Sequence, residues 1–422
     1  MSPFQNSTLP DHSKVGWVDQ PSQRGTIDII WSCLLVIFIS TWTVLHTNLP
    51  TPGESYWSIL IRKARWSAFT IYAPEAVTMI AACQRASAKR SMEQMQAIGA
   101  RHWTVVHGFF ADSGGFMLHS PDMPPFPVNS RAIYYLVNKK YIDAPSATKE
   151  DIQDHSKSDR FAKVVAIVQG TYMIAQTIAR AIQHMEISNL ELTTVAFVLC
   201  TSFTFLFWID KPQGVERAFD LKTTTPIRTI LTEAGPVARA PYADTPMDFV
   251  EQPGWSQWKR RPIFSHVGIP VRPLQRFPND YAVAPQTLRL AIPLWLLTLV
   301  HASCHILAWN FPFPTNWERW IWRGSSVTMS GVMLIWGFAE VMSVKPGFDL
   351  TMTLLGIWEK KASRNTCFRN WAVDGPGTLS AILYGLARTL LVIETFASLR
   401  RMNSSAYYTV DWTQFIPHFS PF

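Results

Sequence analysis

The chain has 422 residues, of which 48% are hydrophobic and 16% are charged, and its formal net charge is +8. Because an ordinary soluble domain is about 25% charged, this composition favours an integral membrane protein. No basic motif with interleaved aromatic residues indicates a nucleic-acid partner. We interpret the positive charge as a determinant of membrane topology and of contact with anionic lipids, so we expect membrane lipids as partners.

Apolar stretches of the length needed to cross a bilayer, about 20 residues, recur along the chain. They predict an all-α fold, a polytopic transmembrane helix bundle of seven or eight spans. A shorter stretch, 103–117, could be the eighth span, a re-entrant hairpin or an interfacial helix, and it ends in a glycine pair typical of a helix C-terminus. The longer stretches are 28–46, 67–84, 162–183, 191–209, 287–308, 320–342 and 378–397.

Lys and Arg are distributed unevenly among the loops between these stretches. Residues 211–284 carry ten and residues 344–377 carry five, whereas the short links 184–190 and 309–316 carry none. Cationic loops stay in the cytoplasm during insertion. We therefore expect the loops 211–284 and 344–377 to be cytoplasmic and the short links 184–190 and 309–316 to be lumenal.

The long cationic loop is rich in proline and lacks sustained periodicity, so we expect it to be irregular and partly ordered, and not a second domain. Glycosylation sequons at Asn6 and Asn403 suit lumenal termini and an even number of spans. We predict a protein of the endoplasmic reticulum or another secretory membrane. The organisation expected is a polar segment 1–27, first helices and the short piece 28–118, a cytoplasmic loop with two spans 119–210, the Pro-rich loop 211–286, and the last three spans with the tail 287–422.

Glu75 follows Pro74 in the middle of the expected span 67–84. A proline there frees a backbone carbonyl and can kink the helix beside the acid. A carboxyl group at bilayer depth is costly, so it is either paired for structural reasons or used as a proton site, and both interpretations stay open. The aromatic side chains of Trp66 and Tyr72 could form the walls of a cavity beside Glu75.

The last expected span contains Arg388 and Glu394, which are six residues apart and point to different helix faces. Each therefore needs a partner elsewhere, and Glu75 or Glu340 is the expected partner of Arg388. The pairs could fix helix packing only, or they could line a polar cavity that binds substrate.

Histidines occur in two further patterns. His107 and Asp112 flank a Phe pair in the short stretch, where they diverge on a helix but could converge in a re-entrant turn. His301 and His305 share one helix face, yet no HExxH, paired CxxC or Asp-rich motif accompanies them. We expect no metal and no cofactor.

Several short phrases together resemble a widespread family of fungal polytopic membrane proteins, and the resemblance covers nearly the whole chain. It implies a membrane fold and a fungal origin but gives no established reaction. The phrases are Arg24-Gly25-Thr26-Ile27-Asp28, His46-Thr47-Asn48-Leu49-Pro50, Pro74-Glu75, Phe109-Phe110-Ala111-Asp112-Ser113-Gly114-Gly115-Phe116, Asp154-His155-Ser156-Lys157-Ser158-Asp159, and the ending Asp411-Trp412 to Pro417-His418.

We therefore predict a membrane-embedded enzyme that acts on a lipophilic small molecule, such as an isoprenoid, in fungal secondary metabolism. A protonated carboxyl in an apolar cavity with aromatic walls would suit the acid catalysis of a terpene cyclase. The alternatives are a proton- or ion-coupled transporter or a membrane sensor. The expected catalytic residues are Glu75, Asp112, His107 and Glu394, and the expected substrate-binding residues are Arg388, Glu340, Tyr72 and Trp66.

Overall fold

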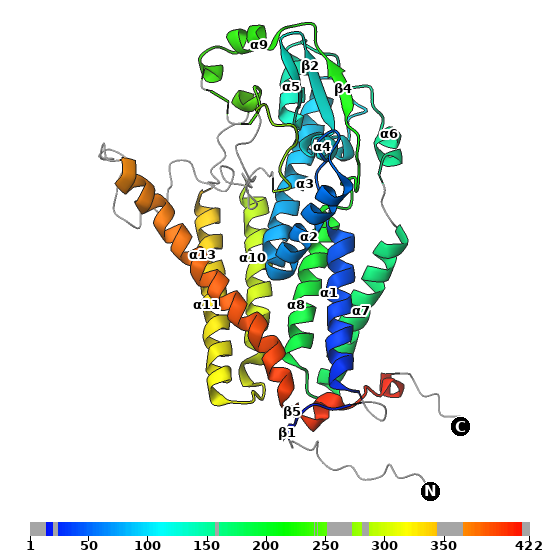
Figure 1. Ribbon diagram of the computed structural model, residues 1–422, viewed down its shortest axis with the longest axis vertical. Helices are drawn as coiled ribbons and strands as arrows, with labels where there is room; N and C mark the ends of the chain where they lie inside the picture. Colours follow the sequence, from blue (N-terminus) through cyan, green and yellow to red (C-terminus); the bar gives the residue numbers. More distant parts are fainter. Residues whose placement is uncertain are drawn as a thin grey trace. The chain divides into compact units, whose positions relative to one another are not determined.

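A computed structural model describes residues 14–19, 24–156, 160–239, 241–242, 244–250, 272–280, 287–343 and 366–415. The chain forms two compact units, and each is described by itself (Figure 1). Unit 1 comprises Met1–Thr43, Phe161–Cys200 and Leu288–Phe422, and unit 2 comprises Val44–Arg160 and Thr201–Thr287.

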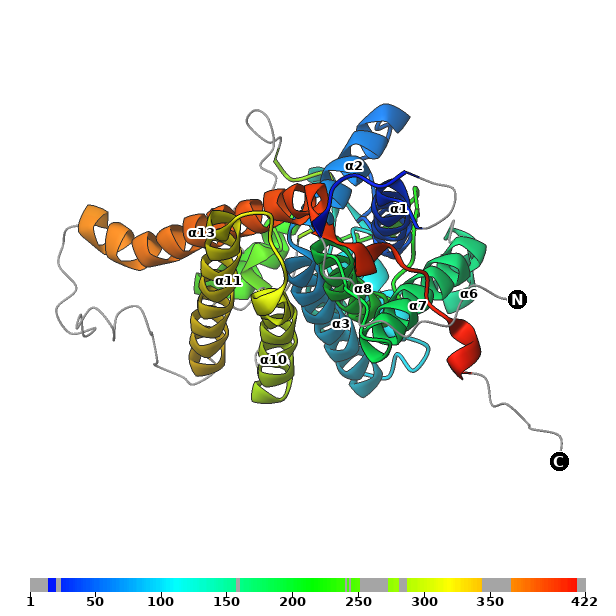
Figure 2. The ribbon, with the colours of Figure 1, turned by 90° about the horizontal axis from the view of Figure 1, so that it is seen from below.

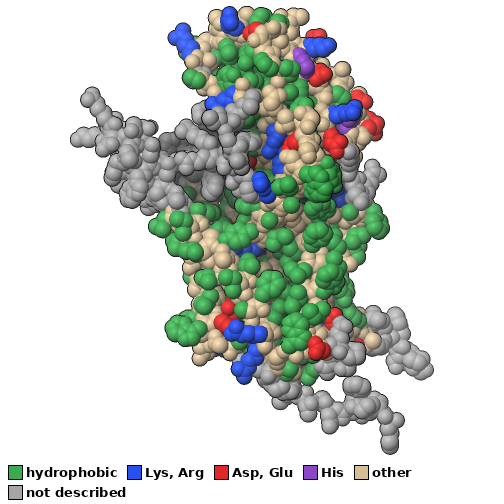
Figure 3. Space-filling view, viewed as in Figure 1, with side chains coloured by type: hydrophobic (Ala, Val, Ile, Leu, Met, Phe, Trp, Pro, Cys, Tyr) green, Lys and Arg blue, Asp and Glu red, His purple; other side chains and the backbone are tan. Residues whose placement is uncertain are grey.

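Unit 1 is built from long helices. Helix α11 lies beside both α10 and α13 (Figures 1 and 2), and buried side chains of all three form one apolar cluster that includes Ala302, Trp322 and Leu391. On the face in Figure 3, hydrophobic side chains cover much of these helices. The elements are β1 (Lys14–Val15), α1 (Thr26–Val44), α7 (Arg160–Ile182), α8 (Asn189–Phe207), α10 (Leu288–Cys304), α11 (Asn316–Ser343), α13 (Thr366–Ala397) and β5 (Met402–Asn403).

Five helical segments of the described chain are long and apolar enough to cross a membrane. They confirm five of the predicted apolar helices. Predicted span 320–342 also forms one helix, within α11, but α11 is not among these five. The five segments are Thr26–Val44, Phe161–Ile182, Asn189–Phe207, Leu288–Asn310 and Leu379–Arg400.

Segments from the early and late parts of the described chain meet in unit 1. Strand β1 pairs antiparallel with β5, and the Tyr407 hydroxyl donates to the Gly16 carbonyl over 2.9 Å. Nearby, the side chain of Arg24 forms a buried ion pair with Glu191 at 2.5 Å. We call β1, β5, Arg24, Arg180, Glu191 and residues 404–408 the terminal clasp.

Arg180 is the centre of the terminal clasp. Its guanidinium is completely buried and makes five hydrogen bonds to the carbonyl oxygens of Glu186, Ser405, Ala406 and Tyr408, at 2.7–3.1 Å. These bonds join the link between α7 and α8 to the segment that follows α13. The buried charge is thus satisfied by backbone acceptors, which is the condition for burying an ion at low cost.

Unit 2 combines helices with a small sheet, which the all-α prediction did not include. Strand β2 pairs antiparallel with β3 and parallel with β4, with Phe116 opposite Phe219. The elements are α2 (Tyr56–Tyr72), α3 (Pro74–Ala97), α4 (Val105–Asp112), β2 (Phe116–Ser120), β3 (Met123–Pro127), α5 (Ser130–Asn138), α6 (Lys149–Asp154), β4 (Phe219–Lys222) and α9 (Ile227–Ala234).

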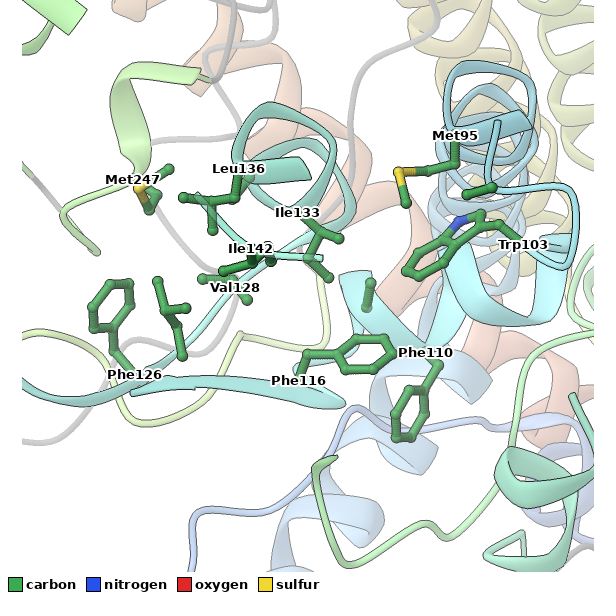
Figure 4. Close-up of a cluster of buried hydrophobic side chains, with 14 of the residues drawn as sticks. Met95, Trp103, Phe110, Phe116, Phe126, Val128, Ile133, Leu136, Ile142 and Met247 are labelled. Atoms are coloured by element: carbon green, nitrogen blue, oxygen red, sulfur yellow. The ribbon is translucent and has the colours of Figure 1, made fainter. Parts of the chain in front are cut away.

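An aromatic core holds these elements together (Figure 4). The ring of Phe116 stacks on Trp103, with centroids 5.8 Å apart, and packs edge-on against Phe110. Ile227 and Ile230 of α9 are fully buried in the same cluster. Because β4 and α9 belong to the Pro-rich loop, the first part of that loop is more ordered than predicted and helps to form a folded unit.

The predicted span 67–84 is not one helix. Helix α2 ends at Tyr72, Ala73 has a non-helical backbone (φ −138°, ψ 69°), and Pro74 opens α3. Proline fits the first turn of a helix because its missing N–H would have no intrahelical acceptor there. Leu49 precedes α2, and its N–H donates to the carbonyl of Ser113, which follows α4. The segment before helices α2 and α3 is therefore hydrogen-bonded to a segment after them.

The predicted piece 103–117 is not a span either. Helix α4 has eight residues, and strand β2 begins at Phe116. Eight helical residues are only about 12 Å long, well short of the hydrocarbon core. Gly114 ends the helix with φ +85°, a conformation that glycine adopts without steric cost.

Candidate functional site

The most unusual side chain of unit 2 is Lys211, which is 4% exposed. Its ammonium group donates to Asn48 Oδ1 at 3.0 Å and to Gln84 Oε1 at 2.9 Å. It also lies 4.9 Å from the centre of the Trp208 ring. Lysine is rarely buried without a carboxylate partner, and within the described residues Lys211 forms no ion pair.

Other hydrogen bonds fix the two amides that hold this lysine. The Asn48 backbone N–H donates to Asn279 Oδ1 at 2.9 Å, and the Asn48 side-chain amide donates to the Pro278 carbonyl at 2.7 Å. Gln84 donates to the Asn279 carbonyl at 3.1 Å and accepts from the Trp208 indole at 2.9 Å. Since their NH₂ groups are occupied, both amides turn their oxygen atoms toward the ammonium.

A buried carboxyl group lies on the same side of α3. Asp112, at the end of α4, accepts from the Ser87 hydroxyl at 2.7 Å and from the Ser130 backbone N–H at 3.0 Å. Gln84 and Ser87 are three residues apart, and residues at this spacing share a helix face. One face of α3 therefore carries the contacts to both Lys211 and Asp112. We call Asn48, Gln84, Ser87, Asp112, Trp208, Lys211 and Asn279 the polar cluster.

Burial shifts both ionisable groups of the polar cluster toward their neutral forms. It lowers the pKa of Lys211 from 10.5 to about 7, although the charge of Asp112 opposes this shift. Burial also raises the pKa of Asp112, against the effect of its hydrogen bonds from Ser130 and Ser87. A lysine whose pKa lies near 7 exchanges its proton near neutral pH, as general acid–base chemistry requires.

The predicted acid Glu75 lies elsewhere on α3. It is 2% exposed and occupies the first turn, directly after the helix break. It precedes Ser87 by twelve residues, so it lies about 18 Å from the Asp112 contact along the helix axis. The two predicted acids therefore do not form one site.

The aromatic residues predicted to surround Glu75 lie on α2. Trp66 is 5% exposed and packs with Val77, Phe109 and Trp208 in an apolar cluster. Tyr72 is partly buried and is the last residue of the helix. Trp66 is thus part of the apolar packing of α3, and its role in binding a substrate remains a prediction.

His107 and Asp112 do not converge, contrary to the re-entrant alternative. Both belong to α4, where His107 Nδ1 accepts the Thr104 backbone N–H at 3.2 Å and closes a capping box. Its other ring nitrogen lies 2.9 Å from the Ala147 carbonyl, and burial lowers the pKa of the imidazole. These contacts give His107 a structural role at the start of α4.

The remaining predicted residues belong to unit 1. Arg388 is buried and donates to His305 Nε2 at 3.3 Å, and His305 packs edge-on against His301. Glu394 is also buried in α13. The side chain of Glu340 lies outside the described residues, so the carboxylate partner expected for Arg388 remains a prediction. Within the described residues, no group of three or more His, Cys, Asp or Glu could hold a metal ion.

Sequence analysis missed Lys211 because it ends an apolar stretch, where a lysine normally serves as an interfacial anchor. A signal was nevertheless present on α3. Gln84, Ser87 and Ser91 recur at helical spacing, and all three are buried. A polar stripe of this kind needs partners from other segments.

Comparison with protein families gives a match over most of the chain. The family model described as "Family of unknown function (DUF8562)" matches residues 2–226 and 288–419. The chain belongs to this family. No curated protein and no solved structure matches it. The matched ranges include most of the polar cluster but omit Asn279, which supports two of its amides.

Proposed function

We propose that this protein is a membrane-embedded enzyme that transfers protons to and from a lipophilic substrate at the polar cluster. One observation carries the proposal: the ammonium of Lys211 is buried among amide oxygens, and the buried carboxyl of Asp112 contacts the same face of α3. A purely structural lysine would be more stable in an ion pair. Perturbed groups gathered in this way are typical of active sites.

The two groups have complementary roles in this proposal. Asp112 in its protonated form donates a proton, and Lys211 in its neutral form accepts one. The Trp208 face, which already contacts the ammonium, can also stabilise positive charge that develops on a substrate. Isomerisation or cyclisation of an isoprenoid in fungal secondary metabolism is the reaction class that we propose, in keeping with the sequence resemblance.

We further propose a bundle of six membrane crossings, fewer than the seven or eight expected from the sequence. Pairing of β1 with β5 requires the first and last crossings to start and end on one side, so the number of crossings is even. The five apolar helices need one more, and α11, with 28 residues, is long enough. Helices α2 and α3 form a hairpin that returns to its own side.

The distribution of basic residues orients this bundle. Arg180 of the terminal clasp donates to the link between α7 and α8, which carries no Lys or Arg, and Arg400 pairs with Glu318 at the start of α11. We therefore assign the clasp to the lumenal side of a secretory-pathway membrane and the loops 211–284 and 344–377 to the cytoplasm.

A proton-coupled transporter is the second candidate. The buried pair of Arg388 and His305 favours it, because ionisable side chains inside apolar helices commonly belong to ion or proton pathways. In that case Lys211 and Asp112 would relay protons and the transported compound would remain chemically unchanged.

Deletion of the gene in its native organism, followed by complementation, tests the proposal. Lipid-soluble compounds of the deletion strain are compared by mass spectrometry after rescue with wild type, Lys211→Met, Asp112→Asn or the exposed control Lys222→Met. If the protein is an enzyme, the deletion strain should accumulate its substrate and lack its product. Only wild type and the Lys222→Met control should then restore the normal levels of both compounds. Redistribution of unchanged compounds across the membrane would instead support the transporter. Full rescue by both polar-cluster variants would refute their catalytic role.

A further inference from the structure

A cleft of about 470 Å³ opens in unit 2 beside the polar cluster. Leu49 and Gly114 line it, and they directly follow Asn48 and Ser113 in the chain. The hydrogen bond between the Leu49 N–H and the Ser113 carbonyl joins these two segments. The cleft has the size of a small-molecule site, which is typically about 300–1,000 Å³.

Two of the acidic side chains that line the cleft are already engaged by protein groups. Glu54 pairs with Arg62 and accepts the Thr51 N–H at 3.1 Å. Asp220 accepts from His119 at 2.9 Å. Glu216 is exposed at the rim. Glu54 and Asp220 therefore offer little remaining capacity to bind a cation.

The basic side chains of the cleft have donors to spare. Arg217 is exposed and makes no ion pair within the described residues. Arg276 is half-buried, and its hydrogen bond to the Phe277 carbonyl is long, at 3.4 Å. Burial and the charge of Arg62 lower the pKa of Arg276 to about 10, although Glu54 and Asp280 partly offset both effects. An anion bound here would relieve the repulsion between Arg276 and Arg62.

Exposed aromatic side chains occur at the start of α2, close in sequence to residues that line the cleft. Glu54 and Ile59, on either side of the start of α2, line the cleft, while Tyr56 and Trp57 between them are 70% and 68% exposed. Tyr and Trp are enriched at membrane–water interfaces. An anionic head group at the cleft and an apolar tail in the membrane would suit this combination of side chains.

We propose that this cleft binds the phosphoryl group of an anionic ligand through Arg276 and Arg217. Planar guanidinium groups suit this role because they donate two parallel hydrogen bonds to phosphate oxygens. The binding itself is independent of catalysis. That the bound group is the head of the enzyme's substrate rests on the proposed function, and it would place a phosphorylated lipophile within reach of the polar cluster.

Binding by the full-length protein in phosphatidylcholine nanodiscs tests this proposal. Inorganic pyrophosphate is titrated as the soluble probe, and phosphatidic acid replaces part of the phosphatidylcholine as the lipid probe. Native mass spectrometry counts the bound molecules. We expect Arg276→Gln and Arg217→Gln to weaken binding at least about tenfold and the exposed Arg228→Gln, on α9, to leave it unchanged. Because Arg217 is exposed, its variant tests the site even where Arg276→Gln fails to fold.

The two probes separate the sources of the phosphoryl group. Arginine-dependent binding of pyrophosphate indicates that the ligand is a soluble phosphate. Arginine-dependent enrichment of phosphatidic acid alone indicates a lipid head group. Either result supports the proposal. Absence of binding to both probes overturns it, as does equal loss in the Arg228→Gln control. Lys211→Met should retain phosphoryl binding in the cleft while it loses product formation. The binding proposal and the enzyme proposal can therefore fail independently.

Discussion

The terminal clasp of unit 1 and the polar cluster of unit 2 both bury a cation, but they treat it differently. Arg180 makes five hydrogen bonds to backbone carbonyls and lies near the ion pair of Arg24 and Glu191. Lys211 has two amide oxygens and an aromatic face, and no carboxylate within ion-pair distance in the described part of the chain.

Under the proposed function, this difference distinguishes a cation that stabilises the fold from one that takes part in proton transfer. Saturation with fixed acceptors keeps a cation charged and immobile, and its loss leaves several buried carbonyls without donors. Incomplete solvation lets a lysine lose its proton, since the neutral amine is the less costly buried form. Labelling, stability and pH measurements can test this contrast between Arg180 and Lys211.

The largest expected effect concerns the membrane side of each region. Single cysteines at Thr413 and Lys222 should react with a membrane-impermeant maleimide from opposite sides of sealed microsomes. Cysteines at Tyr56 and Glu93 should both react from the same side as Lys222, because the α2–α3 hairpin returns. If the cysteines at Tyr56 and Glu93 were labelled from opposite sides, the α2–α3 hairpin would be wrong and the single span expected at 67–84 would be supported.

Removal of the clasp cation should strongly destabilise the protein. Arg180→Met leaves four carbonyl oxygens without their donor, and loss of one side of a buried charged network costs about 3–5 kcal/mol. Thermal unfolding of the purified protein in detergent measures the change. Arg401→Met, an exposed arginine beside the clasp, is the matched control. A variant as stable as this control would show that the clasp is not structural.

Lys211 should affect stability with a specific pH dependence. Its folded pKa of about 7 lies below the unfolded value of 10.5, so the unfolded chain binds more protons at this lysine between these pH values. The free energy of unfolding should therefore rise with pH in this window, by up to about 1.4 kcal/mol per pH unit. Below pH 7 the cost of burying the ammonium is fully present.

Comparison of wild type with Lys211→Met in denaturation at pH 7 to 10 isolates this contribution. The variant should lack the rise, whereas the exposed control Lys222→Met should retain it. Parallel curves for wild type and Lys211→Met would mean that Lys211 does not change its protonation between pH 7 and 10.

The smallest expected effect involves packing without charge. A Cβ atom on Gly337 of α11 would lie 1.5 Å from the Trp295 ring of α10, while one on Gly331 would meet open space. Gly337→Ala should therefore cost about 1–3 kcal/mol through forced movement of the indole. Gly331→Ala should be neutral or stabilising by up to about 1 kcal/mol, because alanine favours the helix. Equal melting temperatures for the two variants would contradict the close packing of α10 on α11.

Sequence predicted the apolar helices well because length and hydropathy are local properties. It was wrong at Pro74, which begins a helix instead of kinking one, whereas the helix C-terminus expected at the Gly114-Gly115 pair is confirmed. The sheet escaped prediction because β3 reads Met-Pro-Pro-Phe-Pro and the other neighbour of β2, strand β4, lies about a hundred residues further along the chain.

Of the polar cluster, only Asp112 was singled out from the sequence, by its position in an apolar run. It is buried, and its catalytic role remains a prediction. Lys211 was not singled out from the sequence because its partners, Asn48 and Gln84, lie in distant segments, and Asn279, which holds both partners, lies in a third. A local pattern cannot reveal a cluster that only tertiary folding assembles.

Because Lys14 pairs with Asn403, strand β1 can pair only late in the synthesis of the chain. Nearly the whole chain must leave the ribosome before the first strand finds its partner, which takes about 20 to 80 s at about 5–20 residues per second. Arg180 itself is made part-way through this interval, and for the following 225 or so residues, about 11 to 45 s, the carbonyl groups of Ser405, Ala406 and Tyr408 do not yet exist. Until then the Arg180 guanidinium lacks three of its five final hydrogen bonds.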